Sequence, residues 1–407
     1  MLKSFLFDVF ILSCFRKKNI LHLKNQTNKM APQSLPVLYA SGTHYQVGFT
    51  VGQTFASNIK RFLAESTGVQ EIDIPFYNSD QGKNHFNSML EICKTNFPQY
   101  VQEIQGMADG AGINFDDLFK LSLSKEVHNI LAKEPAKAKV KEMAGCTDIF
   151  INKPTCKILG HNEDCDPKIK PYGYILSACI LDDEDKEVEN FTAYCYPGVL
   201  PGTAFSFNKH GMVFTVDGLY PNFIVPNAPP RMFLNRNIIK ARSLDEAVEL
   251  IENKGFGVAY GFTVNIADVR KPKEMWSIEI SPQANASLYH IHKVSEQSDT
   301  QEPCHYIHIN SFKHLTTPQV SKLRSSEART KRTEELPAPE NREDVLNMLG
   351  DEGNQDFPIY RTPRPTDLSI TACTVVFDLL RNRADVYTDN PSKEKTSPLL
   401  HFSILDL

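Results

Sequence analysis

The 407-residue sequence lacks the features that mark several classes of protein. No stretch approaches the roughly 18 consecutive apolar residues of a membrane-spanning helix, so we expect no membrane span. The nine cysteines include no Cys-x-x-Cys pair and are odd in number, which argues against a disulfide framework and favours a reducing, cytoplasmic compartment. The sequence has no long basic run and its formal net charge is −5, so nucleic acid is not an expected partner.

Several catalytic motifs are also missing. The sequence has no Gly-x-Ser-x-Gly elbow of the kind that presents a serine nucleophile. Glycine-rich loops of the P-loop or dinucleotide type are absent as well, and we expect no cofactor. With 41% hydrophobic and 23% charged residues, the composition is otherwise that of an ordinary globular protein.

The first 29 residues form an N-terminal extension that we expect to lie outside the fold. Residues 1–15 are apolar, but Asp8 interrupts them, the basic cluster 16–18 follows them instead of preceding them, and no small-x-small cleavage site is present. These features do not fit a secretory signal peptide. We expect the working protein to begin near Met30, and a weak membrane anchor is the alternative interpretation of the extension.

Helical periodicity dominates the first third of the sequence, and strand patterns dominate the rest. Thr43 and Gln46 form a capping-box signature at the start of an amphipathic helical pattern. A polar loop is expected over residues 132–142, and strands separated by turn residues follow from Cys146 onward. Helical stretches are expected at residues 44–65, 89–93, 98–107 and 114–123. This order of elements predicts an α+β layered fold.

The pair Gly145-Cys146 stands at the border between the helical and the strand-rich parts. Cleavage before Cys146 would give one residue both a thiol nucleophile and a free α-amino group. An α-amino group has a pKa of about 7.7–8.0, so it can act as a base at neutral pH. The pair therefore fits a self-cleaving enzyme, while a buried structural cysteine at the start of a strand is the alternative that the dipeptide leaves open.

Residues 160–166 (Gly-His-Asn-Glu-Asp-Cys-Asp) are dense in ligand-type side chains. Metal binding is one interpretation, but the spacing matches no zinc pattern and alternate residues of a strand face opposite sides, so we expect no metal. A polar turn is the second interpretation. In the third, a hairpin that starts at Cys146 returns Asp164 to it, where the carboxylate would hold the new ammonium group.

Two later strand patterns carry polar residues of catalytic type. Asn265 lies inside the pattern 263–268, where a buried amide needs partners and could donate a hydrogen bond to an oxyanion; an exposed position is the alternative. Residues 305–311 contain two histidines and Asn310. A Ser/His/Asp triad could be assembled from such residues, but the missing serine elbow does not support one.

Several segments together resemble one protein family, and they occur in that family's order. They are residues 42–48 (Gly-Thr-His-Tyr-Gln-Val-Gly), 145–147 (Gly-Cys-Thr), 160–164 (Gly-His-Asn-Glu-Asp), 265–268 (Asn-Ile-Ala-Asp), 279–282 (Glu-Ile-Ser-Pro) and 306–310 (Tyr-Ile-His-Ile-Asn). The set resembles the acyl-coenzyme A:isopenicillin N acyltransferase family of N-terminal nucleophile hydrolases. Segments 35–39, 97–101 and 389–392 are similar to the insect N-β-alanyldopamine hydrolases within it, and the likeness extends over residues 34–392.

The resemblance implies a four-layer αββα sandwich. It also implies a precursor that is cut at Gly145-Cys146 into a helical α chain, residues 30–145, and a β chain, residues 146–407. The site residues that it implies are Cys146 as nucleophile, with its amino group as base, Asp164 as the acidic residue and Asn265 as the oxyanion donor, with Asn310 and His161 as candidates for substrate binding.

The activity implied is hydrolysis of N-β-alanyl biogenic amines, such as N-β-alanyldopamine and N-β-alanylhistamine (carcinine), to β-alanine and the free amine. The expected partners are therefore a small-molecule N-acyl amine and, within one precursor, the α and β chains. Segments 310–312 and 351–353 depart from the family pattern, which puts the substrate choice in question. An N-acyltransferase and a non-enzymatic binding paralogue are the alternatives.

Overall fold

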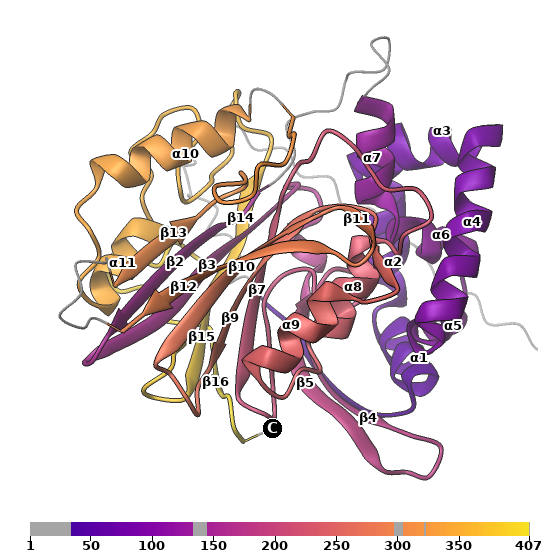
Figure 1. Cartoon of the computed structure of the whole chain (residues 1–407), viewed down its shortest axis with the longest axis horizontal. Coiled ribbons are helices and arrows are strands. Elements are labelled where there is room, and N and C mark those ends of the chain that lie inside the picture. The colour runs from indigo at the N-terminus through magenta and orange to yellow at the C-terminus, as the bar shows by residue number, and fades with distance from the viewer. Residues whose placement is uncertain (1–33, 133–144, 297–303, 321–322, 407) are drawn as a thin grey trace, which may run out of the picture. The chain divides into compact units, whose positions relative to one another are not determined.

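Helices make up most of the described residues before Gly145 (Figure 1). The computed structural model describes residues 34–132, 145–296, 304–320 and 323–406. The predicted N-terminal extension, and nearly all of the polar loop predicted over residues 132–142, lie outside these ranges. This part of the chain contains β1 (Val37–Gly42), α1 (His44–Thr54), α2 (Ala56–Glu65), the π-helical turn η1 (Val69–Asp73), α3 (Ile74–Tyr77), α4 (Asp80–Asn96), α5 (Pro98–Ala111), α6 (Phe115–Leu121) and α7 (Ser124–Ala132).

The capping box predicted before the first helix is present. The Thr43 side chain accepts a hydrogen bond from the Gln46 backbone N–H, and the Gln46 side chain accepts one from the Thr43 N–H. The single helix predicted over residues 44–65 is wrong, because the chain breaks into α1 and α2 at Phe55. The Phe55 ring stacks on Tyr174 of the sheet at 4.0 Å between centroids, a tertiary contact that helical periodicity does not encode.

The larger sheet has eight strands in the order β1-β4-β5-β6-β7-β9-β10-β12. β1 runs parallel to β4, and every other pair in this sheet is antiparallel. The additional strands are β4 (Tyr174–Leu181), β5 (Glu187–Cys195), β6 (Ser206–Asn208), β7 (Met212–Gly218), β9 (Phe262–Asp268), β10 (Glu274–Ser281) and β12 (Leu288–Ser295). A short pair forms beside it from β8 (Phe256–Val258) and β11 (Gln283–Asn285).

The smaller sheet has six strands in the order β13-β2-β3-β14-β15-β16 and is antiparallel throughout. Its central hairpin follows Cys146 directly, as the strand pattern predicts. The strands are β2 (Thr147–Lys153), β3 (Cys156–Cys165), β13 (His305–His308), β14 (Ile370–Asp378), β15 (Arg383–Tyr387) and β16 (Leu400–Ser403). The remaining helices are η2 (Lys170–Tyr172), α8 (Arg231–Ile238), α9 (Leu244–Glu252), α10 (Arg324–Glu335) and α11 (Arg342–Leu349).

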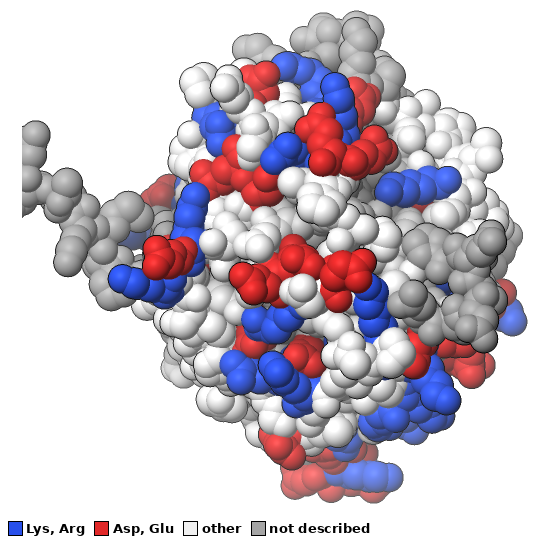
Figure 2. All heavy atoms as spheres, turned by 90° about the vertical axis from the view of Figure 1, so that its left-hand side faces the viewer, with Lys and Arg blue, Asp and Glu red and all other residues white. Residues whose placement is uncertain are grey.

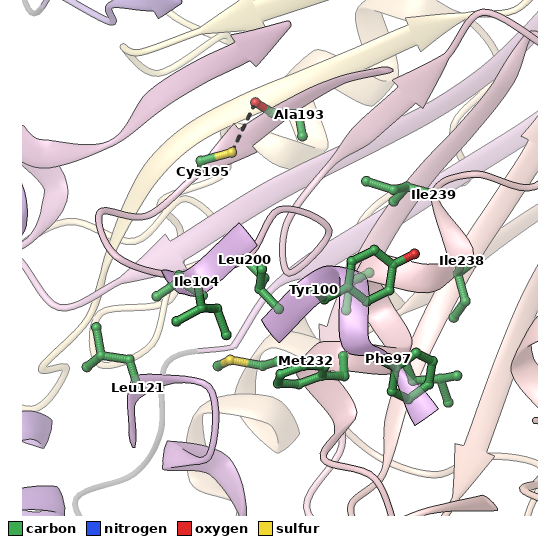
Figure 3. Packing of buried hydrophobic residues seen from close by; sticks show 14 of the residues in the cluster. Phe97, Tyr100, Ile104, Leu121, Ala193, Cys195, Leu200, Met232, Ile238 and Ile239 are labelled. Atoms are coloured by element: carbon green, nitrogen blue, oxygen red, sulfur yellow. Dashed lines mark hydrogen bonds between the residues drawn. The ribbon is translucent and has the colours of Figure 1, made fainter. Parts of the chain in front are cut away.

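Three apolar clusters hold the elements in layers. In the first, α1, α2, α5, α8 and α9 cover one face of the larger sheet, and Figure 3 shows part of it, where side chains of α5, α6, α8 and β5 meet. The second lies between the two sheets, where Phe150 and Leu159 meet Phe207 and Val213. The third packs α11 on the outer face of the smaller sheet. Because each sheet buries both faces, the fold is the predicted αββα sandwich.

Charges of both signs are mixed on the face that carries α10 and α11 (Figure 2). Groups of Lys and Arg side chains lie beside groups of Asp and Glu there, so neither sign covers the whole visible face. Among the helices of the described segments, none is both apolar enough and long enough to span a bilayer.

Candidate active site

Cys146 is buried and immediately precedes β2. The β2–β3 register pairs Thr147 with Asn162, so the cysteine comes beside the next residue of β3, Glu163. The Cys146 thiol donates to Glu163 Oε2 at 3.6 Å. Burial, followed by the neighbouring Glu163 charge, raises the pKa of this thiol well above its ordinary value. In this environment the thiol needs a base at hand before it can act as a nucleophile.

His161 connects Glu163 to a second carboxylate. Its Nε2 lies 3.1 Å from Glu163 Oε2, and its Nδ1 lies 3.1 Å from both oxygens of Asp148. Burial alone lowers the pKa of His161, but the Asp148 carboxylate outweighs it, and the pKa lies well above the ordinary range. Tyr196 donates its hydroxyl to Glu163 Oε1 at 2.6 Å. His161 is therefore held as an imidazolium that donates from both ring nitrogens.

The Gly145-Cys146 peptide contacts two buried arginines. Arg361 Nη1 donates to the Gly145 carbonyl oxygen at 3.4 Å, and Arg329 Nη1 donates to the Cys146 carbonyl oxygen at 2.7 Å. Arg329 also donates to Asn310 Oδ1 at 2.8 Å. A Cβ on Gly145 would lie 2.0 Å from that same oxygen, so a larger residue here would displace the Asn310 side chain. Asn310 thus packs against the residue before the proposed cut.

Asp164 points to the opposite face of β3 from Glu163. It accepts a hydrogen bond from Thr371 Oγ1 at 2.8 Å, and its Oδ2 lies 3.5 Å from Arg361 Nη1. Burial raises the pKa of Asp164 to about 6, although the Arg361 charge opposes the rise. The hairpin does return Asp164 to a cavity that Cys146 also lines, while the carboxylate in contact with the thiol belongs to Glu163.

Asn265 is fully buried on β9, which excludes the exposed alternative. Its Nδ2 donates to Thr215 Oγ1 at 3.2 Å and to Asp217 Oδ2 at 3.3 Å, and its Oδ1 accepts from Ser277 at 2.7 Å. Thr215 in turn donates to Asp148. In this structure the amide therefore connects to the Cys146 site through Thr215, Asp148 and His161, and its N–H groups are already engaged.

A cavity of about 280 Å³ opens beside Cys146. Segments from both sides of Gly145 line it: α2, η1 and α7 before the glycine, and β3, β7 and α8 after it. Asp73, only 3% exposed, has a pKa raised to about 7, chiefly by burial. Its Oδ1 makes no hydrogen bond to any residue in the described ranges. Lys125 also lines the cavity, and burial lowers its pKa.

Among the residues that the structure describes, two groups of side chains offer enough donors to consider a metal. Cys146, His161 and Glu163 form one, and Asp148, His161 and Asp217 form the other, each with its ligand atoms within 4.8 Å of one another. The two groups share His161, whose ring nitrogens both hydrogen bond to carboxylates. A histidine needs a free, neutral nitrogen to bind a metal, so these contacts fit a hydrogen-bonded network better than a metal site.

Sequence reasoning missed several site residues. Glu163 had a usable signal, because it is two residues from His161 and alternate strand residues share a face. Asp148 had the same kind of signal, because it is two residues from Cys146. Arg329, Arg361 and the η1 residue Asp73 carried no local signal, since each lies far along the chain from the cysteine.

The fold and this site define a class of protein. A family model described as acyl-coenzyme A:6-aminopenicillanic acid acyl-transferase matches residues 151–393, more than half of the chain. The chain therefore belongs to this family, which confirms the resemblance seen in the sequence.

Two relatives match over most of their length. The beta-alanyl-dopamine/carcinine hydrolase of Drosophila melanogaster is 32% identical over 384 residues, covering 91% of this chain and 97% of that protein. The acyl-coenzyme A:6-aminopenicillanic-acid-acyltransferase 40 kDa form of Emericella nidulans is 22% identical over 371 residues, covering 90% of this chain and 96% of that protein.

Proposed function

We propose that this chain is a self-cleaving amidohydrolase that releases β-alanine from N-β-alanyl biogenic amines such as N-β-alanyldopamine and carcinine. The observation that carries the proposal is a buried cysteine that lines a cavity and is preceded by a glycine packed against Asn310. The similarity to a beta-alanyl-dopamine/carcinine hydrolase supports the substrate class.

Maturation comes first in this mechanism. The Cys146 thiolate attacks the Gly145 carbonyl carbon, and the Arg361 guanidinium polarises that carbonyl. The resulting thioester is hydrolysed by water, which leaves an α chain ending at Gly145 and a β chain beginning at Cys146. We assign Asp164, which lines the same cavity as Cys146, to pair with the new amino group and tune its proton.

Turnover then uses both functions of the N-terminal cysteine. The free amino group takes the thiol proton, and the thiolate attacks the amide carbonyl of the substrate. Asn265 stabilises the oxyanion, which requires its Nδ2 to exchange one of its present partners for the substrate oxygen. The amine leaves with a proton from the ammonium group, and water resolves the acyl-enzyme to β-alanine.

The cavity offers a place for the charged end of the substrate. A β-alanyl group carries an ammonium, which needs a carboxylate or carbonyl partner when it is taken out of water. Asp73 Oδ1 is a buried carboxylate oxygen at the cavity that accepts no hydrogen bond from a described residue, although His128 Nε2 lies 3.8 Å away. We therefore assign substrate ammonium recognition to Asp73.

An N-acyltransferase is the second candidate, since the family model and the Emericella relative are named for that activity. The two activities differ in what resolves the acyl-enzyme. With carcinine as the donor and dopamine as the added amine, a hydrolase releases β-alanine and histamine, whereas a transferase forms N-β-alanyldopamine and histamine.

The deciding experiment is the intact mass and N-terminal sequence of the purified protein under denaturing conditions, beside Cys146→Ala. We expect two chains, one beginning at Cys146, with release of β-alanine from N-β-alanyldopamine, and an uncut, inactive variant. A single uncut wild-type chain without hydrolase activity would contradict the proposal and favour a binding role.

A further inference from the structure

The proposed self-cleavage poses a problem that the turnover mechanism does not solve. Before the cut, the Cys146 nitrogen is an amide, which has no basic lone pair, so the amino group that serves turnover does not yet exist. The thiol is buried and its pKa is raised, so it does not ionise unaided. Some other group must accept its proton during maturation.

We propose that Glu163 is the base of self-cleavage, its Oε2 taking the Cys146 thiol proton while the Cys146 nitrogen is still an amide. This inference rests on the proposed self-cleavage and deepens it. Oε2 is the atom that the thiol already contacts, at 3.6 Å. Tyr196 and His161 donate to the two Glu163 oxygens from other directions, which fixes the carboxylate toward the thiol.

The other titratable groups near the thiol are less suited to this task. His161 donates from both ring nitrogens, to Glu163 and to Asp148, so it has no lone pair to offer. Asp164 lies on the opposite face of β3 and interacts with Thr371 and Arg361. Lys125 also lines the cavity, but the hydrogen bond of the thiol is to Glu163 and not to this lysine. Glu163 is therefore the carboxylate whose position allows it to accept the thiol proton.

His161 has a supporting role in the same step. As an imidazolium held by Asp148, it places a positive charge 3.1 Å from the oxygen that receives the proton. That charge stays close to the sulfur and stabilises the thiolate as it forms. His161 and Asp148 are therefore positioning residues, which act through Glu163 and the thiol.

The step balances without an outside reagent other than water. The Cys146 S–H bond breaks, its proton passes to Glu163 Oε2, and the sulfur electron pair forms a bond to the Gly145 carbonyl carbon. When the carbon–nitrogen bond breaks, the same proton passes from Glu163 to the departing Cys146 nitrogen. Water then hydrolyses the thioester, which restores the thiol and leaves Gly145 as a carboxylate.

Time courses of cleavage test this role. The full chain is made by cell-free translation, quenched at intervals, and the cut fraction is measured by mass spectrometry. Removing a general base typically slows a step about 10²–10⁴-fold, so Glu163→Gln should cleave at least about 100-fold more slowly than wild type. Asp385→Asn is the matched control, a buried carboxylate on β15 outside the cavity, and should cleave at the wild-type rate.

Chemical rescue separates a base from a structural support. Glu163→Ala removes the carboxylate, and the adjoining cavity gives a small acid access to the vacated space. Sodium formate at about 0.5 M should then speed cleavage roughly tenfold, whereas the same concentration of sodium chloride should not. Glu163→Asp keeps the charge but retracts it by one carbon, and should cleave at a rate between those of wild type and Glu163→Gln.

Each outcome decides for or against the proposal. A folded Glu163→Gln chain that cleaves within about threefold of wild type overturns it, as does a folded Glu163→Ala chain indifferent to formate. If neither variant folds, Glu163→Asp decides: slower cleavage supports the role and a wild-type rate overturns it. A wild-type chain that stays uncut yet releases β-alanine would refute self-cleavage itself. A cut wild type beside an equally cut Glu163→Gln variant would refute only the role of Glu163.

Discussion

At the scale of single residues, buried charges surround Cys146. Glu163, His161 and Asp148 form a continuous hydrogen-bonded chain from the thiol toward Asn265 on the other sheet. Such networks matter because each buried polar group is costly unless it is satisfied. We therefore expect two residues to contact the substrate: Asp73, which has an oxygen that accepts no hydrogen bond from a described residue, and Asn265, whose Nδ2 can exchange a partner.

Asn265→Ala should lower kcat by about 10²–10³-fold and leave KM within a few-fold, because an oxyanion donor acts mainly in the transition state. Steady-state hydrolysis of N-β-alanyldopamine measures both constants. Ser277→Ala is the control, since it removes only the hydroxyl that donates to Asn265 Oδ1, and should cost less than about tenfold in kcat. A kcat near wild type in Asn265→Ala would show that another group stabilises the oxyanion.

Asp73 gives the substrate affinity a dependence on pH. Its pKa is raised to about 7, so the carboxyl is mostly neutral below that pH and charged above it. Only the charged form attracts the β-alanyl ammonium, so KM should fall as pH rises from 6 to 8. In Asp73→Asn, KM should be at least tenfold higher at pH 8, and this dependence should disappear.

The matched control for Asp73 is a substrate without the ammonium. Asp73→Asn should change KM for N-propionyldopamine little, because that acyl group has no charge to recognise. An equal rise in KM for both substrates would mean that Asp73 shapes the cavity and does not recognise the ammonium.

At the scale of elements, α1 and α5 approach each other more closely than ordinary side chains allow. A Cβ on Gly48 would lie 2.1 Å from the Glu103 carbonyl oxygen, and one on Gly106 would lie 2.0 Å from the Tyr45 carbonyl oxygen. Glycine in a helix interior costs about 1 kcal/mol relative to alanine. Here that cost is offset because the absent side chains let the two backbones pack directly.

Gly106→Ala should therefore destabilise the protein by about 1–3 kcal/mol, despite the better helix propensity of alanine, because the helices must move apart. Urea unfolding followed by circular dichroism measures the change. Gly68→Ala is the control: Gly68 is helical and its Cβ would meet His128 at an ordinary 3.7 Å, so stability should stay the same or rise. A Gly106→Ala variant as stable as wild type would show that the helix pair is not tightly constrained.

At the scale of the whole molecule, the two proposed chains share one core. β1 of the α chain is a strand of the larger sheet and pairs with β4 of the β chain. Glu103 of α5 forms a buried ion pair with Arg236 of α8, across the same division. The largest apolar cluster also takes residues from both chains. Cutting the peptide at Gly145 removes none of these contacts.

The cleaved protein should consequently remain one particle. Native mass spectrometry should give the mass of the uncut chain plus one water, while denaturing conditions should release two chains. The uncut Cys146→Ala variant serves as the reference. Separation of the α chain from the β chain in native buffer would show that the shared core alone does not hold them together.

The local sequence determined where several helices and strands of this protein form. Helical spacing and a capping box located the first helix, and the change to strand patterns placed Cys146 at the start of the central hairpin. Asn265 inside a strand pattern was expected to need buried partners, and it has them. These features follow from periodicity and from the chemistry of neighbouring residues, which a chain carries before it folds.

The tertiary structure decided which groups meet. The sequence pointed to Asp164 as the carboxylate near Cys146, whereas strand alternation and the β2–β3 register bring Glu163 to the thiol and turn Asp164 toward Arg361. Arg329 reaches the cysteine from α10, and Asp73 reaches the cavity from η1. No local pattern encodes such contacts, because they depend on how two sheets and their helices pack once long loops have closed.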